Sequence, residues 1–429
     1  MNLLKRYRES IVFNRFIKLF SVDVLIKASS FILLPVYLKL MTQSEFGLFN
    51  YLISIVVFFS QILNFGLFIA QSKIYHELDE AQKAPFIFTI QMTLLILLVP
   101  SILIIYLFHF DYFVITLLFK TPIDYDAFRF PILLAVIASV YSFMLYNYFL
   151  TAEKIKHVQR YNIIRLVLLN VVVLLALYFF KNKVNARLIT TYIIELVLVI
   201  CFFYYLIIEM KPQFNKSQMY RSIKIGFPVM SVAICGVVIN FGDKFLLEKH
   251  GGFVDLSIYY LAFSIASFIP LLFNTFQNIW LPIFLKEKDL KKNLALTKKM
   301  FFTLAGVYII LSVFVIILIK FALLYSFIDL KYNKVLLILP IILISLIIDS
   351  LTHLCINYVT FFEQTYILPI FSTFVGVVSI ISNVFFIKFY GLYGAACSSL
   401  IINILGFLMF YFLLKYNLYK INLAKLLIN

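Results

Sequence analysis

The sequence predicts an all-α integral membrane protein with about twelve transmembrane helices. Of its 429 residues, 63% are hydrophobic, which is more than the core of a soluble protein can bury. The apolar residues come in runs of about 20, the length at which a helix crosses roughly 30 Å of hydrocarbon. Lipid offers the backbone no hydrogen-bond partners, and the runs are too long for barrel strands. Each run is therefore expected to be a helix.

The apolar runs follow one another along the whole chain. The first six cover residues 16–38, 46–68, 86–108, 130–151, 161–180 and 188–208. The other six cover residues 225–247, 256–279, 301–319, 335–357, 365–387 and 392–414. The longest connections on one side, DYFVITLLF after the third run and FALLYSFIDL after the ninth, are themselves partly apolar. No sizeable external domain is expected.

The basic residues predict the orientation. If both termini are cytoplasmic, 23 of the 37 Lys and Arg residues lie on that side, 11 lie on the other and three lie within runs. By the positive-inside rule, both termini are predicted to be cytoplasmic. The net charge of +17 fits contact with anionic lipid headgroups, and nucleic acid is not expected as a partner because no soluble domain presents a basic surface. The basic start MNLLKRYRES is not followed by a short apolar core and a cleavage site, so no removable signal peptide is expected.

The second half of the sequence repeats the first at an offset of 210 residues. This offset pairs Glu153 with Glu363 and the Asn-Tyr dipeptide at 147–148 with that at 357–358. Polar matches at one constant offset are informative, whereas Leu and Ile align easily by chance.

The repeat predicts two domains of six helices, residues 1–210 and 211–429. Because six is an even number of crossings, both halves enter from the same side, and the repeat is parallel. Transporters built from such repeats bind substrate between the halves and rock them alternately.

Charged side chains within the first and seventh runs each share one helical face. Asp23 and Lys27 are four residues apart, and Lys27 lies about 16 Å along the helix from the start of its run, near the bilayer centre. A charge at that depth costs on the order of 3 kcal/mol unless it faces protein or water. Asn240, Asp243 and Lys244 form the analogous cluster, which is expected to face the seam between the halves. The alternative for the first cluster is that Asp23 and Lys27 neutralise each other within one helix.

The tenth run carries Asp349, His353 and Asn357 on one face. A carboxylate and an imidazole so placed could hold a proton or coordinate a cation, whereas helix-to-helix hydrogen bonding is the alternative. Asp349 and His353 are therefore candidate ion-coupling residues, together with Asp23 and Asp243.

Three cations within the runs are candidates for binding an anion, and several amides accompany them. Arg165, about one turn into the fifth run, either extends to the membrane surface or binds a phosphate. The amides suit helix packing or sugar hydroxyls equally well. The candidate substrate-binding residues are Lys27, Arg165, Lys244, Asn240, Asn64 and Asn274.

No enzymatic constellation is apparent. The chain has no Gly-rich phosphate loop, no nucleophile elbow and no His pair at zinc-ligand spacing. Its four cysteines are scattered through the runs and are expected to be small core residues. We therefore expect a protein that is not an enzyme and needs no cofactor or metal.

Four short segments carry a resemblance to a known family: EFGLFNYLISI at 45–55, GFP at 226–228, GDKFLLEKHGGFVDLSIYYLAFSI at 242–265 and YGLYGAACSSLI at 390–401. By their order and spacing, the chain resembles the Wzx-type polysaccharide flippases of the multidrug/oligosaccharidyl-lipid/polysaccharide (MOP) exporter superfamily. In that family the position of Lys244 is usually Arg. Lys keeps the charge but loses the bidentate geometry that suits a phosphate.

The resemblance implies a MATE-like fold of two six-helix bundles around a cavity, in a bacterial cytoplasmic (inner) membrane. It implies an undecaprenyl-pyrophosphate-linked oligosaccharide as substrate, an O-antigen or capsule repeat unit moved from the inner to the outer leaflet by alternating access. Other polysaccharide-assembly proteins are implied as partners. Such a substrate needs a wet cationic cavity for its head, and Lys27, Arg165 and Lys244 are the available cations.

Three other functions compete with this interpretation. A drug or metabolite antiporter of the same superfamily would favour a cavity rich in carboxylates. A lipid II flippase would typically carry two further helices at its C-terminus. A membrane-embedded polysaccharide polymerase or ligase generally presents a large external loop with catalytic Arg or His, which this chain lacks.

Overall fold

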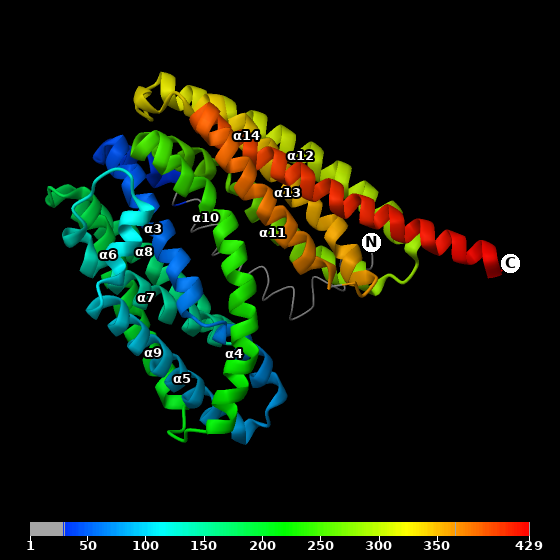
Figure 1. Ribbon diagram of the computed structural model, residues 1–429, viewed down its shortest axis with the longest axis horizontal. Coiled ribbons are helices and arrows are strands. Elements are labelled where there is room, and N and C mark those ends of the chain that lie inside the picture. The colour runs from blue at the N-terminus through cyan, green and yellow to red at the C-terminus, as the bar shows by residue number, and fades with distance from the viewer. Residues whose placement is uncertain (1–28, 30, 365, 429) are drawn as a thin grey trace. The chain divides into compact units, whose positions relative to one another are not determined.

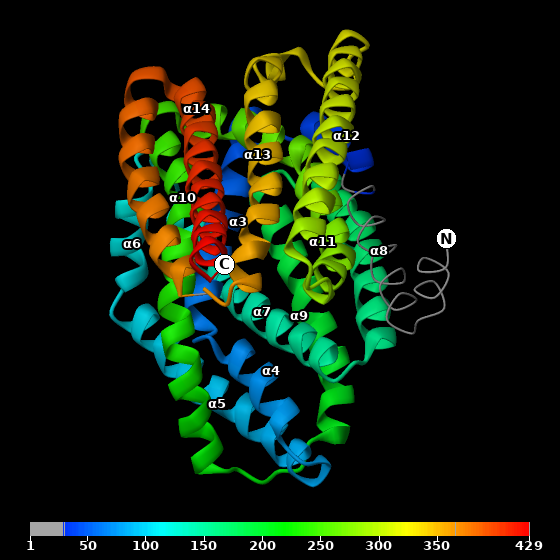
Figure 2. The ribbon, with the colours of Figure 1, turned by 90° about the vertical axis from the view of Figure 1, so that its right-hand side faces the viewer.

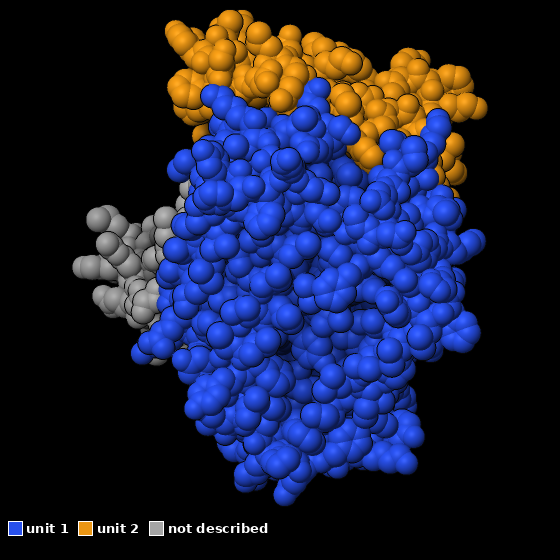
Figure 3. Space-filling view, turned by 90° about the vertical axis from the view of Figure 1, so that its left-hand side faces the viewer, with its two compact units in different colours: residues 1–241 blue, residues 242–429 orange. Residues whose placement is uncertain are grey.

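The computed structural model describes residue 29, residues 31–364 and residues 366–428, and within them all regular structure is helical (Figure 1). The all-α prediction is thus confirmed. The chain divides into two compact units, residues 1–241 and residues 242–429 (Figure 3). The division falls inside one long helix, α10 (Lys216–Ala266).

The first unit is built from helices that pack against one another in sequence-distant pairs. Thr42 caps α3 (Gln43–Leu63) with a capping box: the Glu45 N–H donates to the Thr42 hydroxyl, and the Glu45 carboxylate accepts from the Thr42 N–H. Helix α7 packs on α9, and α8 packs on α9 (Figure 2). Besides the short helix Phe31–Leu40 and the start of α10, the helices are α3 (Gln43–Leu63), α4 (Leu67–Glu77), α5 (Glu80–Leu107), α6 (Phe110–Leu118), α7 (Tyr125–Thr151), α8 (Ile155–Phe179) and α9 (Lys183–Glu209).

The second unit repeats this order of helices after the end of α10. Asp289 caps its longest uninterrupted helix, because its carboxylate accepts from the Lys291 N–H at 2.9 Å. Gly391 adopts φ +54°, which breaks the last helix in two. The elements are α11 (Phe268–Lys286), α12 (Leu290–Leu324), the 3₁₀ turn η1 (Leu330–Tyr332), α13 (Val335–Phe361) and α14 (Ile367–Ile428).

Within the described residues, nine helical stretches are long and apolar enough to cross a membrane. One of them, Ile367–Lys420, contains two predicted runs, 365–387 and 392–414, separated by the break at Gly391. The predicted run 16–38 lies largely outside the described residues. The chain is thus a multi-pass membrane protein, and the count of twelve spans stays a prediction.

The internal repeat is visible in the backbone. Helices α7 and α13 begin and end 210 residues apart. After each helix a glutamate takes a left-handed conformation, Glu153 with φ 55° and Glu363 with φ 57°. Both turns are closed by the same bond, from Lys154 N–H to Phe149 O at 2.7 Å in one unit and from Gln364 N–H to Val359 O at 2.8 Å in the other. The predicted duplication is therefore confirmed.

Asn147 of α7 and Asn357 of α13 are equivalent in the repeat. Each forms a hydrogen bond to a neighbouring helix, α4 in the first unit and α11 in the second. The Asn147 side chain donates to Phe68 O of α4 at 3.0 Å. Asn357 accepts from the Gln277 amide of α11 at 2.6 Å. Hydrogen bonds from side-chain amides hold membrane helices together, because apolar side chains pack equally well against protein and lipid.

The break between α3 and α4 brings two stretches of backbone into direct contact. Gly66 has φ +66°, and a Cβ there would lie 2.1 Å from Gly226 O. A Cβ on Gly226 would lie 2.5 Å from Phe65 O. The glycine of the GFP segment therefore allows the backbone of α10 to approach the backbone at the α3/α4 break.

Substituting Gly226 with alanine is expected to destabilise the first unit by about 1–3 kcal/mol, the usual cost of overpacking. The atoms that must move are backbone atoms, which a change of rotamer cannot relieve. The measurement is the midpoint of thermal unfolding of the purified protein in detergent. Gly306→Ala in α12 is the control, because a Cβ there meets nothing within 4 Å. An unchanged midpoint for Gly226→Ala would refute this account of the contact.

Candidate functional site

A buried carboxylate, Glu195, organises a polar cluster in the first unit. It lies on α9 and is only 4% exposed. Arg165 of α8 forms an ion pair with it through Nε. The Tyr161 hydroxyl donates to its second oxygen at 3.1 Å, and Ser142 of α7 lies 2.6 Å from that hydroxyl. Three helices thus converge on one carboxylate within the membrane-spanning region.

The ion pair uses only part of the Arg165 guanidinium. Glu195 is bonded to Nε, and the two terminal nitrogens have no hydrogen-bond partner in the part of the chain that the structure describes. The Arg165 side chain is 38% exposed, whereas that of Glu195 is 5% exposed. Glu195 therefore fixes the orientation of a guanidinium whose outer edge remains able to bind a second anion in a bidentate manner.

The second unit has the same fold without this cluster. At the offset of 210 residues, Tyr161 corresponds to Phe371 and Arg165 to Val375. Helix α14 contains no acidic residue at all, and Phe371 packs against a buried apolar cluster formed by Cys355, Val359 and Phe410. The second unit thus builds the corresponding helices with apolar residues at these positions.

Asp243 and Lys244 neutralise each other at the start of the second unit. The Lys244 ammonium lies 2.9 and 3.2 Å from the two Asp243 oxygens. The chain changes direction at Gly252. Beyond this point, the Tyr259 hydroxyl donates a hydrogen bond to the Asp243 carboxylate at 2.6 Å. Both side chains of the pair are largely buried, at 14% and 19% exposure. Asp243 and Lys244 therefore form a neutral ion pair, and the hydrogen bond from Tyr259 holds the Asp243 carboxylate in place.

A second polar region, the α11/α13 seam, is formed in the same unit where these two helices pack. Gln277 and Asn357 are joined by two bonds, of 2.6 and 3.3 Å, across the seam. One turn further along α13, the exposed His353 ring lies 5.6 Å from the ring of Phe273. Asp349 follows after one more turn on the same face of α13.

Two polar side chains of the α11/α13 seam, Asn274 and His353, are exposed, whereas Asn357 is buried. Asn274 is exposed and has no hydrogen-bond partner among the described residues. Such groups in a membrane-spanning helix face water or protein rather than lipid. At the corresponding seam of the first unit, Phe68 and Phe143 stand in place of Asn278 and His353, with their rings 5.0 Å apart. At these two positions the first unit therefore has aromatic rings where the second unit has an amide and an imidazole.

The other predicted residues are placed as follows. Asn64 ends α3, and its side-chain oxygen accepts from the Gly66 N–H at 2.8 Å, so it stabilises the break between α3 and α4. Asp23 and Lys27 lie outside the described residues, as does the side chain of Asn240. Among the predicted charges, Arg165 therefore lies in the first unit, and Asp243 and Lys244 lie together in the second. Asn274, Asp349 and His353 line the α11/α13 seam of the second unit.

Sequence reasoning missed the groups that hold the charges. It gave no role to Ser142, Tyr161 or Tyr259. A signal existed for Tyr161, which lies four residues before Arg165 and so on the same helical face. Nothing in the sequence pointed to Ser142 or to the contact between Tyr259 and Asp243, because these contacts depend on how the helices are rotated.

The family model described as "Polysaccharide biosynthesis protein" matches residues 13–288, more than half of the chain. The chain belongs to the polysaccharide biosynthesis protein family. A search of curated proteins found no match to it.

Solved structures similar to this polysaccharide biosynthesis protein are membrane transporters. The lipid II flippase MurJ in an inward closed conformation aligns with a TM-score of 0.68 at 17% identity, covering 91% of this chain and 87% of that one. An inward-facing multidrug resistance MATE transporter of the MOP superfamily gives 0.62 at 13% identity, covering 93% and 94%. The Vibrio cholerae MATE transporter VcmN, in a mutant form, gives 0.55 at 14% identity, covering 95% and 94%. The MATE-like fold predicted for this family member is therefore confirmed.

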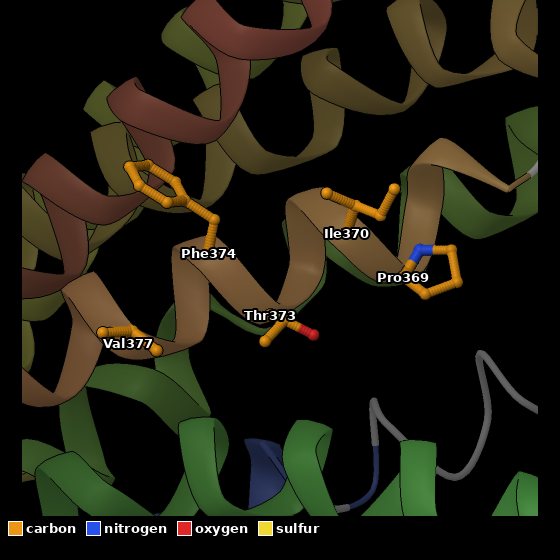
Figure 4. A pocket seen from close by; sticks show the side chains of 5 residues that line it. All are labelled: Pro369, Ile370, Thr373, Phe374 and Val377. Atoms are coloured by element: carbon orange, nitrogen blue, oxygen red, sulfur yellow. The ribbon is translucent and has the colours of Figure 1, made fainter.

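One face of α14 in this family member forms an open apolar hollow (Figure 4). Its lining comes from successive turns of the helix, and the Thr373 hydroxyl is its one polar side-chain group. A surface of this kind accommodates hydrocarbon and offers nothing that would recognise a sugar or a phosphate. The lining residues are Pro369, Ile370, Thr373, Phe374 and Val377.

Proposed function

We propose that the protein is a flippase that moves polyprenyl-pyrophosphate-linked oligosaccharides, such as O-antigen or capsule repeat units, from the inner to the outer leaflet of the bacterial cytoplasmic membrane. Membership of the polysaccharide biosynthesis family carries this proposal. The duplicated transporter fold supports it, because alternating access is the mechanism that such repeats serve. Both termini are proposed to be cytoplasmic, in agreement with the excess of basic residues on that side.

The substrate proposed has an anionic head, and Arg165 suits it best among the described cations. Its guanidinium is oriented by Glu195 and keeps two terminal nitrogens for a phosphate. Lys27, whose position near the bilayer centre follows from the sequence, is proposed as a second contact. Lys244 is bound to Asp243 and would reach a phosphate only when that pair separates.

The energy source is proposed to be an ion gradient acting through the α11/α13 seam. Asp349, which is half-buried, and His353, which is exposed, lie one turn apart on one face of α13. Asn274, exposed on α11, is proposed to hydrogen-bond the sugar hydroxyls. Asp243 is a further proposed coupling group, because its protonation would release Lys244.

A drug or metabolite antiporter is the second candidate. The similarity to multidrug MATE transporters and the carboxylates of the second unit favour it. The two functions differ in the charge of the substrate: an anionic head requires the oriented Arg165, whereas a cationic drug would be repelled by it.

The experiment that tests the proposal is deletion of the gene in its host, followed by analysis of surface polysaccharide and of lipid-linked intermediates in each leaflet. Loss of surface glycan, with single repeat units accumulating on the cytoplasmic leaflet, is the expected result. Repeat units accumulating on the outer leaflet would instead indicate a polymerase or ligase. A normal glycan coat with increased drug sensitivity would indicate the antiporter.

A further inference from the structure

Arg187 has no role in the function proposed above, and it lies in a cage of aromatic rings. It is in the second turn of α9, and its guanidinium carbon lies 4.1 Å from the centre of the Tyr37 ring and 4.0 Å from that of Phe49. Both aromatic residues are buried, and Phe46 lies beside them at 6.0 Å. Attraction between a guanidinium and the face of a ring holds the side chain in one orientation.

No carboxylate neutralises Arg187 within the described part of the chain. Its Nη1 donates to the Sδ of Met41 at 3.4 Å, and a thioether is a weak acceptor. Glu45, next to Phe46 in the sequence, accepts instead from the Thr42 N–H and hydroxyl, at 2.8 and 3.0 Å. A guanidinium carries five N–H donors, and the other donors of Arg187 have no hydrogen-bond partner among the described residues, where its side chain is half-buried.

The depth of Arg187 matches the level of lipid phosphates. Helix α9 has 27 residues and is therefore about 40 Å long, which is the thickness of a bilayer with its headgroups. Arg187 lies four residues after Lys183, the first residue of the helix, or about 6 Å along its axis. The headgroup region of a bilayer is about 5–8 Å thick on each side. When α9 spans the bilayer together with its headgroups, the cage lies where headgroup and hydrocarbon meet.

We propose that Arg187, held between Tyr37 and Phe49, binds the phosphate of a lipid. A guanidinium that is held between rings and has unbonded N–H groups is suited to bidentate recognition of phosphate. The aromatic rings can contact the hydrocarbon chains of the same lipid. The phosphate could belong to a membrane phospholipid or to the pyrophosphate of a polyprenyl-linked sugar. The site does not depend on the proposed flippase function, since it would bind a lipid phosphate whatever the transporter carries.

The test measures thermal unfolding of the purified full-length protein in neutral detergent while lipid is added. Phosphatidylglycerol is the phosphate-bearing probe, and diacylglycerol is the matched lipid without phosphate. Phosphatidylglycerol is expected to raise the unfolding midpoint of the wild type, and diacylglycerol is not. Arg187→Met should require at least tenfold more phosphatidylglycerol for the same rise, while Arg187→Lys, which keeps the charge without the fork, should fall between the two.

Lys181→Met is the control, because it removes an exposed positive charge six residues earlier and should leave the response unchanged. Polyprenyl pyrophosphate, added in a parallel series, separates the two sources. A dependence on Arg187 in both series assigns the site to lipid phosphates in general, and a dependence in the pyrophosphate series alone assigns it to the carrier lipid. If Arg187→Met responds to both lipids as the wild type does, or if neither lipid stabilises the wild type, the proposal is overturned.

Discussion

Replacing Glu195 with leucine is expected to cost about 3–5 kcal/mol of stability, because it leaves the Arg165 guanidinium in the membrane interior without its carboxylate. The rest of the cluster does not add to this loss, since Tyr161 and Ser142 still have each other as partners at 2.6 Å. The amount of folded protein in the membrane and the unfolding midpoint in detergent measure the effect.

The double variant Arg165→Val with Glu195→Leu separates stability from function. It introduces the residues found at the corresponding positions of the second unit, Val375 and Leu405. Removing both charges together often leaves stability unchanged or improves it. We therefore expect the double variant to fold like the wild type and to fail in restoring surface polysaccharide to a deletion strain.

Two results would contradict this account. A double variant as unstable as Glu195→Leu would mean that the cluster is needed for the fold of the first unit. A stable double variant that restores surface polysaccharide fully would remove Arg165 from the list of substrate contacts. Tyr161→Phe is the control for packing, because it keeps the ring and corresponds to Phe371 in the second unit.

The repeat could be predicted from the sequence because polar residues are rare in apolar helices and so determine the alignment. Glu153 and Glu363 were paired by offset alone, and both prove to close the same left-handed turn. Helix ends were predicted less well. The run 86–108 corresponds to α5, which begins at Glu80, since hydrophobicity marks the part of a helix in lipid and not its polar extension. The run 46–68 crosses the break at Gly66, because its residues remain apolar on both sides.

The sequence predicted clusters of candidate residues along single helices, but not the contacts between helices. Arg165 was recognised as a charge within a run, but its partner Glu195 lies 30 residues away on another helix. Periodicity gives the face of a helix on which a residue lies and does not give the neighbour that this face meets. Asp243 and Lys244 are adjacent in the chain. Their contact with Tyr259 could not be predicted, because it depends on the change of direction at Gly252. Arg187 was counted only as a charge outside the runs, since nothing in the sequence brings Tyr37 and Phe49 to it.

Substituting Asp349 with asparagine is expected to abolish the dependence of substrate binding on the coupling ion while leaving the fold intact. Coupled sites typically change each other's affinity by about 5–150-fold, and this factor should fall to one when the carboxylate is lost. The fold should tolerate the change, because Asp349 has no ion pair or hydrogen bond among the described residues apart from those of its helix backbone. The measurement is binding of a polyprenyl-pyrophosphate analogue to the purified protein at several pH values and sodium concentrations.

Asp329→Asn is the matched control, because it makes the same chemical change outside the membrane-spanning helices. The backbone N–H and the ammonium of Lys331 lower the pKa of Asp329, so this carboxylate is ionised at neutral pH and takes no part in titration there. This change should remove the ion pair with the Lys331 ammonium at 3.2 Å and leave ion coupling unchanged. His353→Phe, which copies Phe143 of the first unit, should abolish a dependence on protons and spare one on sodium. If Asp349→Asn keeps the full dependence on both ions, coupling does not pass through the α11/α13 seam, and Asp243 becomes the remaining candidate coupling carboxylate among the described residues.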